Sequence, residues 1–377
     1  MKTSPPTIKA LIGDMFASDM QTIVNTVNCV GIMGKGIAQI FKKEYPAMFE
    51  DYADRCARGE VRLGAPYHYK DLAGTSIVNF PTKGHWRAAT RLDDVEAGLD
   101  YFVKHFRAWG ITSVAFPPLG CGNGGLEWAT VGPLMYSKLK GLGIPVELYA
   151  PFGTPTIQLK EEFLGADQQM EFSVKGRRRE KLRPEWAALV EVLYELELQP
   201  YANPVGRTIF QKICYILTKQ GVDTGFQFER KSYGPFAEEV KEAINVLANN
   251  NWVIEQQLGQ MTALRVGPEY AKARVKLAEE LKPFQRKIDK TVDLFSRIKN
   301  TDQAEEVATV IFAVQNLKQE RKPEEVSEAD LFNYILDWKK LWKKDESKQH
   351  SLAEAIRNLE MLGWVKLRFS ESLPVPV

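Results

Sequence analysis

Residues 22–36 read TIVNTVNCVGIMGKG, a β-branched run followed by three glycines within six positions. The run Thr22–Val27 predicts a strand, and Gly36–Tyr45 predicts a helix with Pro46 after its end. Glycines let the backbone approach a ligand closely, and a helix N-terminus offers free N–H groups to phosphate. The glycine order matches neither GxGxxG nor the P-loop, in which Ser or Thr follows the lysine. The loop is therefore a phosphate-binding candidate of another type, with a purely structural glycine turn as the alternative.

Predicted strands and helices also alternate before and after this stretch. Such a pattern predicts an α/β domain with a mixed, mostly parallel central sheet flanked by helices. Domains of this kind place ligands in the loops beyond the carboxyl ends of their strands. The other expected strands are Ile8–Ile12, Ser76–Asn79, Ser113–Phe116 and Val146–Ala150, and the other expected helices are Leu92–Trp109 and Trp128–Leu142.

The amino-acid composition of the chain changes near residue 160. Of its 27 glycines, 18 lie in residues 1–160, although the chain has 377 residues. We expect an α/β domain over residues 1–155, a linker over 156–183 that holds the basic run Lys175–Lys181, and a mainly helical domain over 184–377. Helices are expected at Trp186–Leu198, Thr208–Gln220, Phe236–Asn249, Tyr270–Leu281, Phe284–Ile298, Gln303–Gln319 and Glu328–Leu341.

The helical half contains an internal echo. Residues 243–253 and 355–365 share Ala, Ile, Leu, Trp and Val at equivalent positions. Each copy predicts a helix followed by a short strand, at Trp252–Glu255 and at Trp364–Phe369. This order is typical of a winged-helix unit, although chance or shared packing explains the matches equally well.

Charge and cysteine content exclude several classes of protein. With 50 Lys and Arg against 48 Asp and Glu, the net charge is +2, which excludes a polycation that coats nucleic acid. No apolar stretch reaches the length of a membrane span, and residues 1–7 hold no signal-peptide core. Four cysteines without a CxxC pair argue against a zinc site or a disulfide framework. We therefore expect a cytoplasmic protein without a metal.

Three further loops carry chemically useful residues. Gly13-Asp14 follows the first strand, where the carboxylate serves either a ligand amine or a helix N-cap. Residues 80–87, FPTKGHWR, place Lys83 after another strand, with an aromatic ring and Arg87 nearby. Residues 117–128, PPLGCGNGGLEW, form a second glycine loop before a helix. Cys121 has no partner base in that loop, so a small buried side chain is the better interpretation.

Together and in this order, these loops resemble those of the macrodomain family, whose members bind ADP-ribose. The resemblance covers roughly residues 8–155 and rests on Gly13-Asp14, on IVNTVNCVGIMGKGIA (residues 23–38) and on PPLGCGNGGLEW. The segment NFPTKGHWR (residues 79–87) is similar to the branch that cleaves ADP-ribosyl bonds with a lysine, which includes the DarG antitoxins. A helical domain after the macrodomain is also similar to their layout.

The resemblance implies a role for each matching residue. Asp14 would accept a hydrogen bond from the adenine amine, with Gly13 beside it. Lys83 would be catalytic, and Asn28 would lie close to the scissile bond. ADP-ribose would be ligand and product, with no cofactor and no metal. Its further contacts would be Asn25, Thr26, Gly31, Ile32, Met33, Gly34, Gly36, Thr82, Trp86, Leu119, Gly120, Cys121, Gly122 and Asn123.

The implied reaction removes ADP-ribose from a thymidine base in single-stranded DNA, by breaking the C1″–N bond through an oxocarbenium-like transition state. Lys83 would either attack C1″ as a neutral amine or give a proton or positive charge to the departing thymine. Related lysine-dependent macrodomains that act on protein-linked ADP-ribose carry an acidic residue in the second glycine loop. Here residues 122–125 read GNGG, which favours the DNA-directed branch.

The helical half resembles the toxin-binding region of the DarG antitoxins, and Tyr233-Gly-Pro-Phe236 resembles the signature turn of Panacea-type antitoxin domains. The implied partners are the ADP-ribosyltransferase toxin DarT and ADP-ribosylated single-stranded DNA, with no membrane. Two alternatives stay open at this point. One is a non-catalytic reader of ADP-ribose, and the other is a DNA-binding regulator that uses winged helices.

Overall fold

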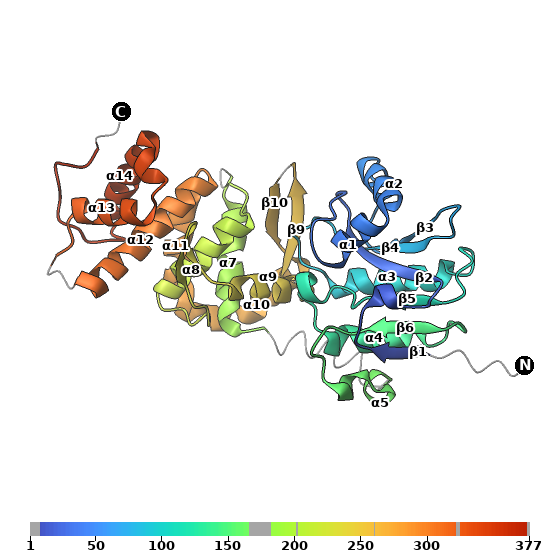
Figure 1. The fold of residues 1–377 in the computed structure, drawn as a ribbon. Coiled ribbons are helices and arrows are strands. Elements are labelled where there is room, and N and C mark those ends of the chain that lie inside the picture. The colour runs from blue at the N-terminus through green and yellow to red at the C-terminus, as the bar shows by residue number, and fades with distance from the viewer. Residues whose placement is uncertain (1–7, 166–181, 201–202, 260, 322–324, 375–377) are drawn as a thin grey trace, which may run out of the picture. The chain divides into compact units, whose positions relative to one another are not determined.

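The computed structural model describes residues 8–165, 182–200, 203–259, 261–321 and 325–374 (Figure 1). These residues form two compact units, whose principal boundary falls between Leu182 and Arg183; the segment Ile244–Asn250 also groups with the N-terminal unit. The predicted linker begins with two short helices, η3 (Thr156–Leu159) and α5 (Glu161–Leu164). Its basic run Lys175–Lys181 lies outside the described residues.

The N-terminal unit is built on a six-stranded sheet with the order β1-β6-β5-β2-β4-β3. All neighbouring pairs are parallel except β3 with β4, which confirms a mixed, mostly parallel sheet. The strands are β1 (Ile8–Leu11), β2 (Thr22–Asn28), β3 (Tyr67–Lys70), β4 (Ser76–Lys83), β5 (Val114–Phe116) and β6 (Val146–Tyr149).

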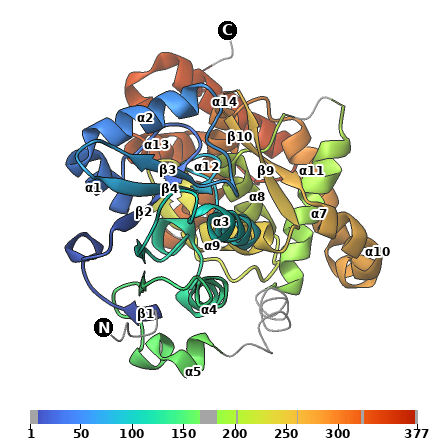
Figure 2. The same ribbon diagram turned by 90° about the vertical axis from the view of Figure 1, so that its right-hand side faces the viewer.

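Helices cover both faces of this sheet (Figures 1 and 2). On one face Val24 and Phe80 pack with α3 (Leu92–His105) and α4 (Trp128–Leu139). On the other, Val27 packs with α1 (Gly36–Glu44) and α2 (Pro46–Ala57). The β-branched residues of β2 are buried or half-buried on both faces, which agrees with the strand predicted at Thr22–Val27.

Three features of this unit differ from the sequence prediction. Helix α2 and edge strand β3 were not predicted, and Pro46 begins α2 at its first position rather than only ending α1. Strand β4 continues past Asn79 to Lys83. Its pairing with β3 stops at Asn79, so beyond that point β4 keeps β2 as its partner. Proline has no backbone N–H to donate, and Pro81 is tolerated because, among the described residues, β4 has no partner strand on its β3 side at this position.

The C-terminal unit is mostly helical, as predicted. Its longest helix, α12 (Thr301–Arg321), contacts α8, α13 and α14 and is buried over residues 307–314. The other helices are α7 (Pro184–Leu198), α8 (Arg207–Lys219), α9 (Glu239–Asn249), α10 (Pro268–Leu281), η4 (Lys282–Phe284), α11 (Gln285–Ser296), α13 (Glu328–Trp338), η5 (Trp342–Lys344) and α14 (Glu346–Met361). None of the helices described in either unit is long and apolar enough to cross a membrane.

Two hairpins complete the C-terminal unit. Strands β7 (Glu229–Lys231) and β8 (Gly234–Phe236) enclose the turn at Ser232 and Tyr233. Strands β9 (Val253–Leu258) and β10 (Met261–Val266) follow α9, and Gly206 forms an isolated bridge with Ala263 of β10. Apart from the β7–β8 hairpin, which is inserted between α8 and α9, the order α7, this bridge, α8, α9 and β9–β10 is the element order of a winged-helix unit.

The second copy of the internal echo has the helix, α14, but lacks the strand. Residues 364–369 were expected to form one and do not; Arg368 makes only an isolated bridge to Ser327. Arg368 N–H donates to the Val326 carbonyl at 2.9 Å, and Glu328 N–H donates to the Arg368 carbonyl at 2.9 Å. The segment around Arg368 is therefore hydrogen-bonded to the start of α13. Among the described residues, no adjacent strand continues this pairing.

Candidate functional site

Four loops follow the carboxyl ends of parallel strands and meet along one edge of the sheet. Gly13-Asp14 follows β1, residues 29–36 follow β2, residues 84–87 follow β4 and residues 117–127 follow β5. Asp14 and Lys83 are four strand spacings apart in the order β1-β6-β5-β2-β4, or about 19 Å at ~4.8 Å each. This edge suits an extended ligand with one end at each residue.

Lys83 is the last residue of β4 and lies opposite Asn28 of β2. The register shifts at a β-bulge between Val27 and Asn28, and such a bulge re-aims the side chains beside it. The Lys83 Nζ donates a hydrogen bond to the backbone carbonyl of Asn123 at 2.5 Å. The two candidate catalytic residues are therefore neighbours, and Lys83 reaches the second glycine loop.

The Asn28 amide shapes the first glycine loop. Its Oδ1 accepts hydrogen bonds from Val30 N–H at 3.0 Å and from the Tyr52 hydroxyl at 3.0 Å, and its Nδ2 donates to the Ile32 carbonyl at 2.5 Å. Tyr52 comes from α2, is fully buried, and also contacts the Asn28 carbonyl at 2.9 Å. Sequence reasoning missed Tyr52, and the signal that could have located it was Pro46 as a helix start.

The first glycine loop presents backbone rather than side chains. Gly31 and Gly36 have φ values of 77° and 60°, which side-chain-bearing residues rarely adopt. Helix α1 starts at Gly36 without a side-chain cap from Lys35, so its first N–H groups stay available to an anion. A Cβ on Gly36 would lie 3.5 Å from Asn123 Nδ2, which brings this loop against the second one.

The second glycine loop is shaped by Thr90. A Cβ on Gly120 would lie 2.6 Å from Thr90 Cγ2, and one on Gly124 would lie 2.5 Å from Thr90 Oγ1. Thr90 N–H also donates to the Gly124 carbonyl at 3.2 Å. Gly122 and Asn123 lie exposed at the loop tip. The tight packing on Thr90 thus requires glycine and holds the loop close to Lys83.

Cys121 does not have the character of a nucleophile. Burial, together with the nearby Glu127 carboxylate, raises the pKa of its thiol to about 12. The thiol therefore stays protonated at neutral pH, and a thiolate is the reactive form of cysteine. This agrees with the interpretation of Cys121 as a small packed side chain in the loop.

Asp14 and Trp86 are exposed at opposite ends of the site edge. The Asp14 Oδ1 accepts from Phe16 N–H at 3.0 Å and caps the short helix η1 (Met15–Ala17). The capping alternative is therefore realised, while the carboxylate still faces outward. Trp86 is 40% exposed, and the Arg87 guanidinium lies 4.4 Å from its ring centroid. A flat face and a cation thus stand next to Lys83.

Not every predicted contact residue offers its side chain to the site edge. Asn25 is fully buried, and its Nδ2 donates to Asn79 Oδ1 at 2.9 Å. The side chains of Met33, Thr82 and Leu119 are also buried, with 5% exposure or less. Thr26 and Gly13 are partly or fully accessible, and Ile32 and Gly34 are exposed. Asn25 and Thr82 are buried on strands β2 and β4, whereas Met33 and Leu119 are buried in the glycine loops, so the side chains of these four residues are not exposed at the site edge.

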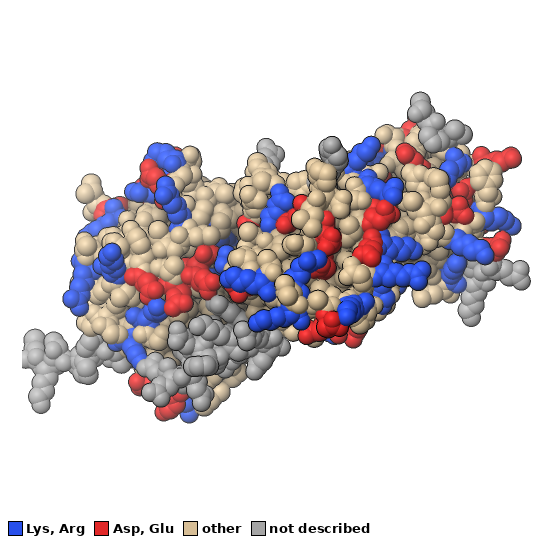
Figure 3. Space-filling model, turned by 180° about the vertical axis from the view of Figure 1, so that it is seen from behind, with Lys and Arg blue, Asp and Glu red and all other residues tan. Residues whose placement is uncertain are grey.

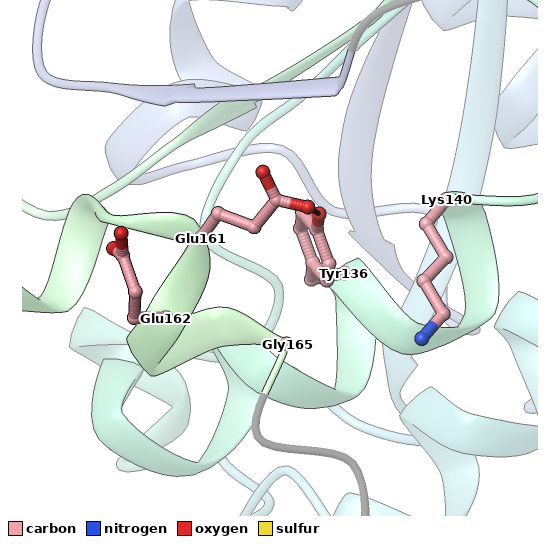
Figure 4. Close-up of a pocket in the computed structure, with 5 residues that line it drawn as sticks. All are labelled: Tyr136, Lys140, Glu161, Glu162 and Gly165. Atoms are coloured by element: carbon pink, nitrogen blue, oxygen red, sulfur yellow. Dashed lines mark hydrogen bonds between the residues drawn. The ribbon is translucent and has the colours of Figure 1, made fainter.

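A pocket of about 350 Å³ lies elsewhere in the N-terminal unit (Figure 4). It is lined by Tyr136, Lys140, Glu161, Glu162 and Gly165. The Tyr136 hydroxyl donates to Glu161 Oε1 at 2.7 Å, and the two side chains point toward one another. The pocket lies at the carboxyl end of α4, whereas the second glycine loop precedes the amino end of that helix, so it is separate from the candidate site.

Comparison with known proteins identifies this arrangement. Residues 24–135 match the Macro domain family. The N-terminal unit is a macrodomain. This result confirms the fold class and the family resemblance drawn from the loop sequences.

Two individual relatives are similar to this chain over the macrodomain and beyond. The DNA ADP-ribosyl glycohydrolase of Mycobacterium tuberculosis is 36% identical over 245 residues, 62% of this chain and 64% of that protein. A DNA ADP-ribosyl transferase–DNA ADP-ribosyl glycohydrolase fusion protein of Thermosipho africanus is 40% identical over 172 residues, 40% of this chain and 44% of that protein. The chain thus spans less than two thirds of the length of these relatives.

One solved structure is similar to part of this chain. The macrodomain of Mycobacterium tuberculosis DarG is 45% identical, with a TM-score of 0.38. The match covers 39% of this chain and 99% of that one.

Proposed function

We propose that this macrodomain is a DNA ADP-ribosyl glycohydrolase, which removes ADP-ribose from thymidine bases of single-stranded DNA. The observation that carries the proposal is the position of Lys83, which lies opposite Asn28 and binds the Asn123 carbonyl of the second glycine loop. A reactive side chain held at the loops that would cradle a diphosphate fits cleavage better than binding alone. The names of the aligned relatives support the same activity.

In the proposed reaction the C1″–N bond breaks, water supplies a hydroxyl group to C1″, and the thymine nitrogen takes a proton. The backbone N–H groups at Gly36 and at the second glycine loop would hold the diphosphate while the base departs. The carbonyl acceptor at 2.5 Å stabilises a charged Lys83 ammonium, which favours the role of proton or charge donor over that of nucleophile. Asn28 would position the loop through its three hydrogen bonds.

Two variants and one trapping experiment separate the roles of Lys83. Lys83→Ala should abolish release of ADP-ribose from a thymidine-modified oligonucleotide, and Lys83→Arg should retain part of it, because charge without nucleophilicity suffices. Sodium borohydride added during turnover should leave no ADP-ribosylated peptide at Lys83. An unaffected Lys83→Ala enzyme contradicts the hydrolase and leaves a reader of ADP-ribose, whereas a trapped adduct establishes a nucleophile.

The C-terminal unit, in our proposal, binds and neutralises a DarT-type ADP-ribosyltransferase. The fusion of a DNA ADP-ribosyl transferase with a glycohydrolase in one relative supports this pairing of activities. Full-length Lys83→Ala protein should still suppress the growth arrest caused by co-expressed toxin and should co-elute with it in size-exclusion chromatography. Loss of rescue in this variant, with no co-elution, would show that hydrolysis alone provides protection.

A further inference from the structure

Two exposed turns of the C-terminal unit lie against each other. One is the β7–β8 turn at Ser232 and Tyr233, and the other is residues 339–344, which follow α13 and read KKLWKK. The Lys339 Nζ joins them by donating to the Ser232 carbonyl, and it also donates to Glu305 Oε1 at 2.6 Å. Lys339 is only 5% exposed, so this connection is an internal support for both turns.

The backbone beneath Tyr233 is held rigidly. The Lys212 Nζ, on α8, donates to the Tyr233 carbonyl at 2.6 Å and to the Pro235 carbonyl at 2.8 Å. Gly234 has φ of 83°, and a Cβ there would lie 2.8 Å from Thr309 Oγ1. The Tyr233 side chain nevertheless stays 70% exposed, and Leu341 on the adjoining turn is 80% exposed. A preorganised backbone lowers the entropic cost of binding through such an exposed ring.

The two turns and the strand beside them also carry exposed cations. Among the described residues, Arg230, Lys340 and Lys344 are exposed and form no ion pair, although Asp345 and Glu346 follow Lys344 directly in the sequence. Glu229 pairs with Lys231 at 2.7 Å, and Asp337 pairs with Lys343 at 3.1 Å. Cations commonly cap a helix carboxyl end, but this accounts for the lysines beside α13 and not for an arginine of β7.

Arg230 is oriented by aromatic rings instead of by a carboxylate. Its guanidinium lies 4.7 Å from the Trp338 ring centroid and 5.2 Å from that of Tyr334. Stacking of this kind leaves the N–H groups at the guanidinium edge free to bind phosphate. Over the face that Figure 3 draws, Lys and Arg are interspersed with Asp and Glu. A binding surface for phosphate must therefore be identified from individual cations that lack an ion-pair partner, and not from a large area of positive charge.

We propose that these residues form a single-stranded nucleic acid site. We name Arg230, Tyr233, Lys340, Leu341 and Lys344 the Tyr233 surface. A base stacks on the Tyr233 ring, Leu341 adds apolar contact, and the cations bind the flanking phosphates, which is the usual combination in single-strand binding. This site goes beyond the proposed hydrolysis and toxin binding, because it gives the C-terminal unit its own contact with DNA.

The chemistry of the Tyr233 surface favours a single strand over two other occupants. A base paired within a duplex offers no free face to a protruding ring, whereas an unpaired base does. A protein that itself binds DNA carries cations where it meets phosphate, and unpaired cations opposite them would repel. Single-stranded DNA matches both the ring and the charge.

The expected salt dependence follows from the number of cations. Three phosphate contacts on a single strand give a slope of log affinity against log salt of about −2. Affinity should therefore fall about 20-fold between roughly 50 and 200 mM salt. Loss of one stacked base should weaken binding about tenfold.

The test uses the full-length protein and an unmodified, fluorescein-labelled oligothymidine in a fluorescence anisotropy titration. The double variant K340E/K344E should weaken binding and flatten the salt dependence, Tyr233→Ala should weaken it about tenfold, and Tyr233→Phe should bind as the wild type does. Lys276→Glu is the matched control, since Lys276 is an exposed lysine on α10 of the same unit. It should leave affinity unchanged.

Several outcomes would overturn the proposal. These are absence of oligothymidine binding by the wild type, variants that bind as tightly as the wild type, and preference for a duplex that the variants do not alter. Variants that keep oligothymidine binding but lose co-elution with toxin would make the Tyr233 surface a protein-docking site instead. Hydrolysis of a modified mononucleotide should be unchanged in all variants, so failure of hydrolysis and failure of this site are distinguishable.

Discussion

The side chain of Lys83 donates a hydrogen bond to the backbone carbonyl of Asn123 across 40 residues of sequence. The bond joins the end of β4 to the second glycine loop, and Gly36 of the first glycine loop approaches the Asn123 side chain from the other direction. This pair thus connects the two glycine loops, which we propose hold the diphosphate, with the lysine that we propose is catalytic. Cleavage and binding should therefore respond differently to substitution at these positions.

Replacing Lys83 tests this separation directly. We expect Lys83→Ala to lower the rate of ADP-ribose release about 100-fold or more, the usual contribution of a positioned proton donor. Its affinity for free ADP-ribose, measured by calorimetry, should change only a few-fold, because in our proposal backbone groups hold the diphosphate. Lys70→Ala, an exposed lysine on β3, serves as the control and should change neither quantity. Equal losses of rate and affinity would mean that Lys83 only binds.

Gly120 should be intolerant of any side chain. Its φ of 72° disfavours other residues, and a Cβ would lie 2.6 Å from Thr90 Cγ2 and 2.8 Å from Leu126 Cδ1. Gly120→Ala should lower the unfolding free energy by about 2–4 kcal/mol and weaken ADP-ribose binding. Urea denaturation measures the first effect and calorimetry the second. Gly141→Ala, where a Cβ meets nothing within 4 Å, should shift stability by no more than about 0.5 kcal/mol.

The predictable parts of this protein are those that short sequence patterns encode. Strand β2 was predictable because its sequence is rich in β-branched residues, and the loop after it because its glycines allow backbone conformations that other residues rarely adopt. The proposed role of Lys83 rests on the sequence segment around it and stays a prediction. Contacts between distant segments were not accessible in this way. Thr90 shapes the second glycine loop from outside its motif, and nothing in residues 117–128 points to it.

Sequence predictions that differ from the structure also depend on contacts between distant segments. The strand expected at residues 364–369 shares residues with the copy at 252–255, yet it has no hairpin partner, and a strand is stabilised by pairing rather than by its own sequence. Asn25 belongs to the motif that predicts ligand contacts, but its alternate position on β2 sends its side chain into the core. Local sequence does not determine which face of a strand a neighbouring helix covers.

Tyr52 should act as a positioning residue for the first glycine loop. Tyr52→Phe keeps the buried ring and removes the hydroxyl that contacts both the carbonyl and the Oδ1 of Asn28. We expect a stability loss of about 1 kcal/mol and a lower kcat with little change in KM. Amide hydrogen exchange should accelerate in residues 29–36.

The control for this prediction is Tyr69→Phe, because Tyr69 packs on the same apolar cluster from β3. It should leave both the rate and the exchange of residues 29–36 as in the wild type. If Tyr52→Phe loses stability without faster exchange in that loop, its hydroxyl has only a general packing role.

Lys212 should make stability depend on pH in the alkaline range. Burial, opposed by Glu305 and reinforced by Lys339, lowers its pKa to about 8. Below that pH the folded and unfolded chains both bind the proton, so the cost of the buried charge is complete. Between pH 8 and the ordinary lysine pKa the unfolded chain binds a proton that the folded chain has released, so the unfolding free energy rises with pH. Between pH 7.5 and 9.5, the unfolding free energy of the wild type, measured by urea denaturation, should therefore rise by on the order of 1 kcal/mol relative to that of Lys212→Met. Lys276→Met, at an exposed position, should show no such gain, and a wild-type advantage that is constant with pH would exclude titration of Lys212 in this range.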